Sequence, residues 1–287
     1  MTERRAYAKI NLGLRIIRRR PDGYHEIETV FHRIDLFDEI SFEPSDSISL
    51  TSSDPAIPTD DRNLCIKAAI ALGQATGTRR GVSMKLRKRI PVGAGLGGGS
   101  SDAASTLLAL KGLWGLATAE EELFRIALQI GADVPYFLKG GTAAATGRGE
   151  QLEYFPLELP YWILIVYPGI QVPTAWAYQN TDIDRLTRRP PFTIPLRQII
   201  SEGAGDLRRL TLHLGNDFEP LVLGAHTAIA QLKAALPAFG AELVLLSGSG
   251  SSVFALFRSE RQARAAETQL GKSYSVFLTG PNFRPPE

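Results

Sequence analysis

The sequence has few of the residues that build disulfides and metal clusters. Among its 287 residues there is one cysteine, Cys65, and there are four histidines. A single cysteine excludes an internal disulfide and any site made of several cysteines, and no two histidines have the spacing of a metal site. Cys65 lies in the apolar helical stretch NLCIKAAIALG, which predicts a buried structural thiol rather than a reactive one.

Long hydrophobic runs and an excess of charge are missing as well. The longest apolar run, YWILIVY at 161–167, is far shorter than the ~20 residues of a membrane-spanning helix, and the first residues lack the apolar core of a signal peptide. With 32 basic and 30 acidic residues the net charge is +2, so no bulk field attracts nucleic acid or a membrane. The basic strings at 15–21 and 85–89 lack interleaved aromatics and are expected to be solvated. We therefore expect a cytoplasmic protein that binds neither nucleic acid nor membrane.

Length and patterning favour two domains of mixed structure. Composition shifts near 157–160, which predicts an N-terminal domain over 1–156 and a C-terminal domain over 157–287. Because strand patterns come first and mix with helices later, an α+β fold with antiparallel sheets is favoured over a doubly wound parallel sheet. Strands are expected at 6–17, through 30–31, near 40–42, and at 47–53, 81–91, 162–167 and 273–279. Pairs of strands joined by a turn are expected within 141–155 and 241–257, and helices at 63–73, 100–116, 119–131, 220–236 and 260–269.

The most informative stretch is PVGAGLGGGSSDAAS at 91–105. Between Gly93 and Gly99 only Ala94 and Leu96 carry a Cβ atom. Glycine lets the main chain approach a ligand closely, and the helix expected to begin near Gly98 offers unpaired amides and the positive end of its dipole. The stretch therefore predicts an anion site, with the phosphates of a nucleoside triphosphate as the ligand and the hydroxyls of Ser100 and Ser101 as further donors.

Other interpretations of this glycine-rich stretch are weaker. The spacing Gly93-x-Gly95-x-x-Gly98 fits the dinucleotide fingerprint, but that fingerprint follows a buried parallel strand, and the strand before it here carries Ser83, Lys85 and Arg87. A Walker A loop is excluded because no Gly-Lys-Ser/Thr ends the stretch. A merely flexible turn does not explain three consecutive glycines at a helix start. A dinucleotide site stays as the lesser alternative.

Five stretches of the sequence together resemble the GHMP kinase superfamily of small-molecule kinases. PVGAGLGGGSS is similar to the superfamily's phosphate-binding motif, and LSGSGSSVFALF at 246–257 is similar to its third motif, a second glycine loop over the site. AYAKINLGL at 6–14 and GADVPYFLKGGTAAATGRGE at 131–150, with RPDGYHEIETVF at 20–31, resemble the branch that phosphorylates a cytidine-diphosphate-linked alcohol in non-mevalonate isoprenoid synthesis. The resemblance implies a two-domain GHMP kinase fold with a ribosomal-protein-S5-like nucleotide-binding domain and a ferredoxin-like C-terminal α/β sandwich.

The resemblance also implies roles for single residues. Asp133 matches the catalytic aspartate, although a cap or turn residue would explain it from the local sequence alone. Lys9 matches the lysine beside that aspartate, whereas the alternating pattern of its strand indicates an exposed side chain. Asn11, on the same strand face, could orient the substrate hydroxyl. ATP is the implied phosphoryl donor, and the phosphate-binding residues are Pro91, Val92, Gly93, Ala94, Gly95, Leu96, Gly97, Gly98, Gly99, Ser100 and Ser101.

Contacts to the two bases follow from the same resemblance. Tyr24 and His25 match the residues that meet cytosine, and Tyr178, with Trp176 as the alternative, matches the aromatic on the opposite wall. Asn63, Leu64 and Lys67 match the helix that borders the adenine. A triphosphate implies Mg²⁺, for which the sequence identifies no dedicated ligands. We expect a monomer or weak homodimer acting on a small-molecule cytidine diphosphate.

Overall fold

The computed structural model describes residues 1–183, 186 and 194–286, and the chain divides into two compact units. Unit 1 comprises Met1–Ala8, Leu36–Val92 and Gly97–Gly140, and unit 2 comprises Lys9–Asp35, Gly93–Leu96 and Gly141–Glu287. The strands β1 (Thr2–Arg19) and β2 (His25–Ser45) contribute residues to both units. Segments of the two units alternate along the chain, so the units do not correspond to the two domains expected over 1–156 and 157–287. Those domain bounds stay a prediction.

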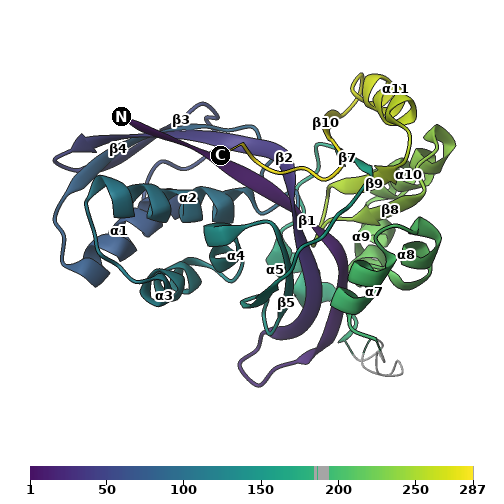
Figure 1. Cartoon of the computed structure of the whole chain (residues 1–287), viewed down its shortest axis with the longest axis horizontal. Coiled ribbons are helices and arrows are strands. Elements are labelled where there is room, and N and C mark those ends of the chain that lie inside the picture. Colours follow the sequence, from purple (N-terminus) through teal and green to yellow (C-terminus); the bar gives the residue numbers. More distant parts are fainter. Residues whose placement is uncertain (184–185, 187–193, 287) are drawn as a thin grey trace. The chain divides into compact units, whose positions relative to one another are not determined.

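Unit 1 is a sheet with helices on one face. Its strands β3 (Ile48–Ser52) and β4 (Gly81–Arg87) join the C-terminal part of β2 in the order β3-β4-β2. Strand β4 is antiparallel to β2, with Ile40 opposite Leu86, and parallel to β3, with Leu50 opposite Met84. Figure 1 shows helices α1, α2 and α3 on one side of these strands. The helices of unit 1 are α1 (Leu64–Thr76), α2 (Gly98–Leu113), α3 (Glu120–Ile130) and α4 (Val134–Lys139).

Local sequence explains how these helices begin and what they bury. Asn63 caps α1, and its side chain accepts a hydrogen bond from the Cys65 amide at 2.8 Å, which satisfies one of the amides that a helix start leaves unpaired. Cys65 is a free, buried thiol, as predicted. In α2 the small residues come first, and most of the segment from Ser101 to Leu110 is buried. Small side chains let this helix pack closely against α1 and α4.

Unit 2 contains a second, fully antiparallel sheet. Its order is β10-β7-β9-β8, and the buried residues Leu164 and Ala255 lie opposite each other in β7 and β9. One face packs against α9, α10 and α11 through side chains such as Val222 and Ile229. The strands of this unit are β5 (Thr142–Thr146), β6 (Gln151–Tyr154), β7 (Trp162–Tyr167), β8 (Leu243–Leu246), β9 (Val253–Phe257) and β10 (Ser275–Thr279), with parts of β1 and β2. The helices are α5 (Thr174–Asn180), α7 (Leu196–Gly203), α8 (Leu207–His213), α9 (Glu219–Ala225), α10 (Thr227–Ala235), the 3₁₀ turn η1 (Leu236–Phe239) and α11 (Glu260–Leu270).

Three sequence predictions about elements are wrong. The strands expected through 30–31 and near 40–42 are one long strand, β2. The helix expected over 220–236 is divided at His226, whose φ of −129° and ψ of 87° are not helical. The short helices α4, α5, α7 and α8 were not predicted. The sequence around 183–191 is rich in Pro and Arg, which predicts a connection between elements, and it lies largely outside the described residues.

Candidate functional site

The first glycine loop (residues 91–99) is held by its carbonyl groups. Within unit 2, the carbonyls of residues 93–96 accept four hydrogen bonds in succession. The donors are the Val172 amide to Gly93 (3.2 Å), the Ser252 amide to Ala94 (3.1 Å), the Ser247 hydroxyl to Gly95 (3.0 Å) and the Lys9 amide to Leu96 (3.0 Å). Because these hydrogen bonds fix the peptide planes, they also fix the directions of the N–H groups on the other side of each peptide.

The backbone of this loop has the conformation of an anion nest. The φ angles of Gly93, Gly95 and Gly97 are +64°, +76° and +73°, while Ala94 and Leu96 between them are not among the positive-φ residues. Alternation of the sign of φ turns successive N–H groups toward one side, and such a concavity binds anions. Gly95 is also required sterically, because a Cβ atom there would lie 2.0 Å from the carbonyl oxygen of Ser247.

A second glycine loop (residues 247–252) packs on the first and is anchored by Asn216. The buried Asn216 amide nitrogen donates to the carbonyls of Leu246 and Gly248, at 2.8 Å each, and its oxygen accepts from the Phe218 amide at 2.9 Å. A Cβ atom on Gly248 would lie 3.6 Å from Nζ of Lys9 and 3.2 Å from Oδ1 of Asn11. The second loop thus brings its backbone next to the predicted catalytic lysine. No motif or spacing in the sequence pointed to Asn216.

Lys9 is buried, which contradicts the expectation of an exposed strand lysine. Both faces of β1 are covered over most of residues 6–16, and Lys9 is 4% and Asn11 2% exposed. Nζ of Lys9 donates to Oδ1 of Asn11 (2.7 Å), Nδ2 of Asn11 donates to the Thr29 hydroxyl (2.8 Å), and that hydroxyl donates to the Gly13 carbonyl (2.6 Å). This series of hydrogen bonds fixes the orientation of the Asn11 amide and with it the direction of the Lys9 ammonium group.

In unit 1 the start of α2 follows the first loop. Gly97 is the N-cap, so Gly98, Gly99 and Ser100 supply the first three amides, which an α-helix leaves without an acceptor inside the helix. The Ser101 amide donates to the Gly97 carbonyl at 2.9 Å, and the Ser101 hydroxyl donates to the Tyr7 carbonyl at 2.7 Å. Ser101 is therefore buried in the helix packing, and the prediction of its hydroxyl as a phosphate donor does not match this geometry.

The remaining predicted residues of unit 1 lie at two helix starts. Asn63 uses its side chain to cap α1 and to donate to the Pro58 carbonyl at 2.8 Å, while Leu64 is half-buried and Lys67 is exposed. Asp133 is the N-cap residue of α4, yet its carboxylate makes no capping hydrogen bond. The local explanation of Asp133 as a cap is thus not realised. Asp133 and Lys9 belong to different units, and their pairing stays a prediction.

Unit 2 brings together the residues predicted to meet cytosine. The rings of His25 and Tyr178 stack with centroids 5.0 Å apart and 15° between their planes, and Tyr178 packs edge-on against Phe218 at 4.9 Å. Trp176, the alternative, packs against His226 instead. Burial, reinforced by Arg19, lowers the pKa of His25 and favours the neutral ring. His25 and Tyr178 thus stack on each other, whereas the side chain of Tyr24 is 57% exposed.

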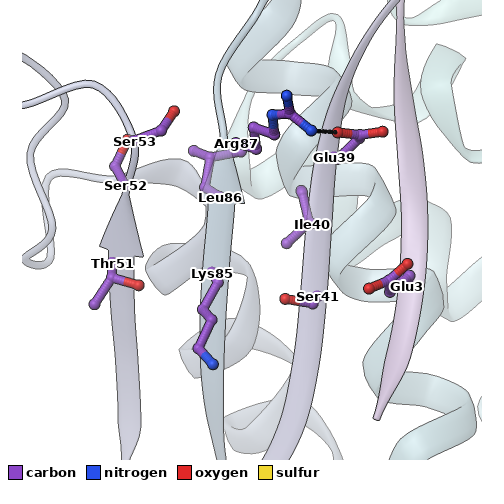
Figure 2. Close-up of a pocket in the computed structure, with 10 residues that line it drawn as sticks. All are labelled: Glu3, Glu39, Ile40, Ser41, Thr51, Ser52, Ser53, Lys85, Leu86 and Arg87. Atoms are coloured by element: carbon purple, nitrogen blue, oxygen red, sulfur yellow. Dashed lines mark hydrogen bonds and ion pairs between the residues drawn. The ribbon is translucent and has the colours of Figure 1, made fainter.

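The basic strings are largely paired with acidic side chains. In unit 2, Arg15 and Arg18 form ion pairs with Glu28 and Glu26, and in unit 1 Arg87 contacts Glu39 at 3.1 Å. That last pair borders a hollow of about 520 Å³ on the open face of the sheet of unit 1 (Figure 2), and none of the ten residues that line the hollow is a predicted site residue. None of the helices in the described part of the chain has the length and hydropathy needed to cross a bilayer.

Comparison with known proteins defines the class. A family model described as the GHMP kinases N terminal domain matches residues 63–141, and one described as GHMP kinases C terminal matches residues 197–276. The chain therefore belongs to the GHMP kinase family. It has the two-domain, mixed α/β fold predicted from the sequence. The fold is shared with a homoserine kinase from Cytophaga hutchinsonii, at a TM-score of 0.71 and 20% identity over 96% of this chain and 93% of that one. Strand β4 before the loop is antiparallel to β2, which rules out the dinucleotide-fold alternative.

More similar proteins fall in one branch of the family. A crystal structure of 4-(cytidine 5'-diphospho)-2C-methyl-D-erythritol kinase matches with a TM-score of 0.82 and 37% identity, over 99% of this chain and all of that one (100%). The 4-diphosphocytidyl-2-C-methyl-D-erythritol kinase of Prosthecochloris aestuarii is 45% identical over 280 residues, 97% of each chain. The enzyme of that name from Salinibacter ruber is 48% identical over 271 residues, 92% of this chain and 93% of the relative.

Proposed function

We propose that this chain transfers the γ-phosphoryl group of ATP to the 2-hydroxyl of 4-diphosphocytidyl-2-C-methyl-D-erythritol. The products are the 2-phosphate and ADP, and the step belongs to isoprenoid precursor synthesis. The observation that carries the proposal is the 45% identity to kinases of this name over nearly the whole of both chains. The anion nest, the second glycine loop and the buried Lys9 ammonium are the features such a transfer needs.

Each part of the site has one task in this reaction. The amides of the first glycine loop and of the start of α2 bind the phosphates of ATP. Lys9 stabilises negative charge on the transferring group, and its ammonium is held for this by Asn11 and Thr29. Asp133 accepts the hydroxyl proton. Because a carboxylate is too weak a base to ionise an alcohol beforehand, the proton passes late, as the loose transition state develops.

Substrate selection rests on the aromatic residues of unit 2. Tyr24 supplies the exposed ring on which cytosine stacks, and Arg148 lies over that ring with its guanidinium carbon 4.8 Å from the centroid, which limits its motion. His25 bonds the edge of the base, and Tyr178 keeps the His25 ring in place by stacking on it. Asn63, Leu64 and Lys67 border the adenine of ATP.

The Tyr24 assignment predicts a selective loss of substrate affinity. Base–aromatic stacking contributes about 1–3 kcal/mol per base, so Tyr24→Ala is expected to raise the KM for the cytidyl substrate about tenfold or more. The KM for ATP should change less than about twofold, since no phosphate contact is removed. Tyr24→Phe is the matched control, because it keeps the ring and should resemble the wild type. Steady-state kinetics with each substrate varied would measure this, and equal changes in both KM values would contradict the assignment.

Mg²⁺, cellular location and assembly are parts of the same proposal. Among the described residues no group of three or more His, Cys, Asp or Glu side chains is arranged to hold a metal. This fits an ion that arrives with ATP and is held mainly by phosphate oxygens and water, as Mg²⁺ prefers. When bound, it would neutralise charge on the β- and γ-phosphates. We also propose that the enzyme acts in the cytoplasm as a monomer or weak homodimer.

An assay of ADP release with several alcohols tests the proposed function. The wild-type chain, ATP and Mg²⁺ would be combined with 4-diphosphocytidyl-2-C-methyl-D-erythritol, homoserine or mevalonate in separate reactions. We expect rapid ADP release with the cytidyl substrate and at least about a hundredfold lower kcat/KM with the others, because only that substrate reaches the Tyr24 platform. A preference for homoserine or mevalonate would contradict the proposal.

A further inference from the structure

Three buried ionisable side chains meet beneath the first turns of α2 in unit 1. Nζ of Lys88 contacts Oδ2 of Asp38 and, at 3.0 Å, Oδ2 of Asp102. The exposed fractions of the Lys88, Asp38 and Asp102 side chains are 6%, 0% and 4%. A buried ion pair adds little net stability compared with well-packed apolar residues. Stability alone therefore does not account for this cluster.

The cluster joins the two ends of the first glycine loop. Oδ1 of Asp38 accepts hydrogen bonds from the backbone amides of Arg89 at 2.6 Å and Ile90 at 2.9 Å. These two residues directly precede the loop. The Lys88 side chain donates a hydrogen bond to Asp102, which lies in α2 just after the loop. A Cβ atom on Gly98 would lie 2.9 Å both from Nζ of Lys88 and from Cγ2 of Ile90. The chain entering the loop and the chain leaving it are thus in contact, and the charged cluster fixes their separation.

The cluster also sets the charge behind the phosphate-binding amides. Burial lowers the pKa of Lys88, but the two carboxylates outweigh burial and keep the pKa above its ordinary value. Burial raises the pKa of Asp102 to about 8, with Lys88 opposing and Asp38 reinforcing the shift. Oδ1 of Asp102 has no hydrogen-bond partner among the described residues. Cys65, which interacts with Asp102 from α1, is neutral because burial raises the pKa of its thiol. Near pH 7 the Lys88 amine is therefore charged, and the carboxyl group of Asp102 ionises only as the pH rises through about 8.

We propose that Asp38, Lys88 and Asp102 are positioning residues for the triphosphate of ATP. They hold together the two chain segments that flank residues 91–97. They also keep the electrostatic potential at the amides of Gly98, Gly99 and Ser100 positive. The inference rests on the proposed function only in that this loop binds ATP. It does not depend on which alcohol accepts the phosphoryl group.

Lys88→Met tests the inference in the whole chain. The affinity for ATP is measured by titration calorimetry without acceptor, and circular dichroism monitors folding. We expect ATP to bind at least about tenfold more weakly, because a charge next to the phosphates is lost and the loop base loosens, while the KM for the cytidyl substrate changes less than about twofold. Lys85→Met, an exposed lysine of β4, is the matched control and should bind ATP like the wild type. A folded Lys88→Met protein with unchanged ATP affinity would overturn the inference.

Asp102→Asn provides an independent test that keeps the shape of the site. Because burial raises the pKa of Asp102 to about 8, raising the pH from 7 to 9 is expected to add a negative charge beside Lys88, near Asp38 and Cys65. ATP affinity should then fall by at least about threefold. In Asp102→Asn this fall should be absent, which a purely structural role would not produce. Identical pH profiles in both proteins would contradict the electrostatic role. A wild type that binds ATP but leaves the cytidyl alcohol unphosphorylated would contradict the proposed acceptor and leave this inference standing.

Discussion

Replacing Asp133 by Asn is expected to lower kcat by about 10²- to 10⁴-fold, the usual contribution of a general base. Asparagine has the same shape as aspartate, but its amide cannot take the hydroxyl proton as the transition state develops charge. The N-cap of α4 is not weakened, because the Asp133 carboxylate makes no capping hydrogen bond. ATP affinity should therefore remain within about twofold of the wild type, since the role we propose for this carboxylate is in proton transfer.

ADP release under saturating ATP and cytidyl substrate measures this effect. Asp46→Asn, in the exposed turn between β2 and β3, makes the same chemical change away from every predicted site residue and should leave kcat unchanged. Near-normal turnover by Asp133→Asn would show that another group accepts the proton. Loss of ATP binding in the same variant would show that Asp133 acts in binding.

Gly95→Ala is expected to be the most damaging small substitution in unit 2. A Cβ atom at residue 95 would lie 2.0 Å from the Ser247 carbonyl oxygen and 3.0 Å from backbone atoms of Gly250. These are main-chain atoms, so both glycine loops must move apart. Overpacking and the left-handed conformation together should lower the free energy of unfolding by about 3 kcal/mol. ATP affinity should fall by about a hundredfold, because the loop amides lose their alignment.

Gly169→Ala separates the steric effect from the backbone effect. Gly169 has a φ of +77°, almost the same as the +76° of Gly95, but no atom lies within 4 Å of the position its Cβ would take. Its substitution should cost only the conformational strain, about 1 kcal/mol, and leave ATP binding intact. Urea unfolding and calorimetry on both variants give the comparison. Equal effects would mean that contact with Ser247 is not what requires glycine at position 95.

The elements of this fold were predictable where the local pattern was unambiguous. The cap of α1, the half-exposed strand β4 and the buried strand β7 follow directly from residue type and periodicity. The pattern failed where tertiary structure decided the outcome. Alternating polar residues predict a half-exposed strand, but both faces of β1 are covered. The buried Lys9 is therefore stabilised by Asn11 and Thr29 instead of by water.

The candidate site was predictable from its glycines and not from the residues that hold them. Three glycines with positive φ mark the first loop in the sequence, because other residues rarely adopt that conformation. Asn216 and Asp38 hold the loops through hydrogen bonds to residues distant in sequence. Asn216 bonds to the carbonyls of Leu246 and Gly248, and Asp38 bonds to residues 88–90. Spacing carries no information about such contacts, so these residues emerge only once the chain is folded.

The central proposal is that a phosphoryl group moves from ATP to one hydroxyl of a cytidine-diphosphate-linked alcohol. ³¹P nuclear magnetic resonance of the wild-type chain with ATP, Mg²⁺ and that alcohol observes every phosphorus atom involved. We predict that a new phosphomonoester signal grows as ATP is converted to ADP, while the diphosphate signals of the cytidyl compound persist. Unchanged ATP, or release of inorganic phosphate with the cytidyl compound unaltered, would contradict the account.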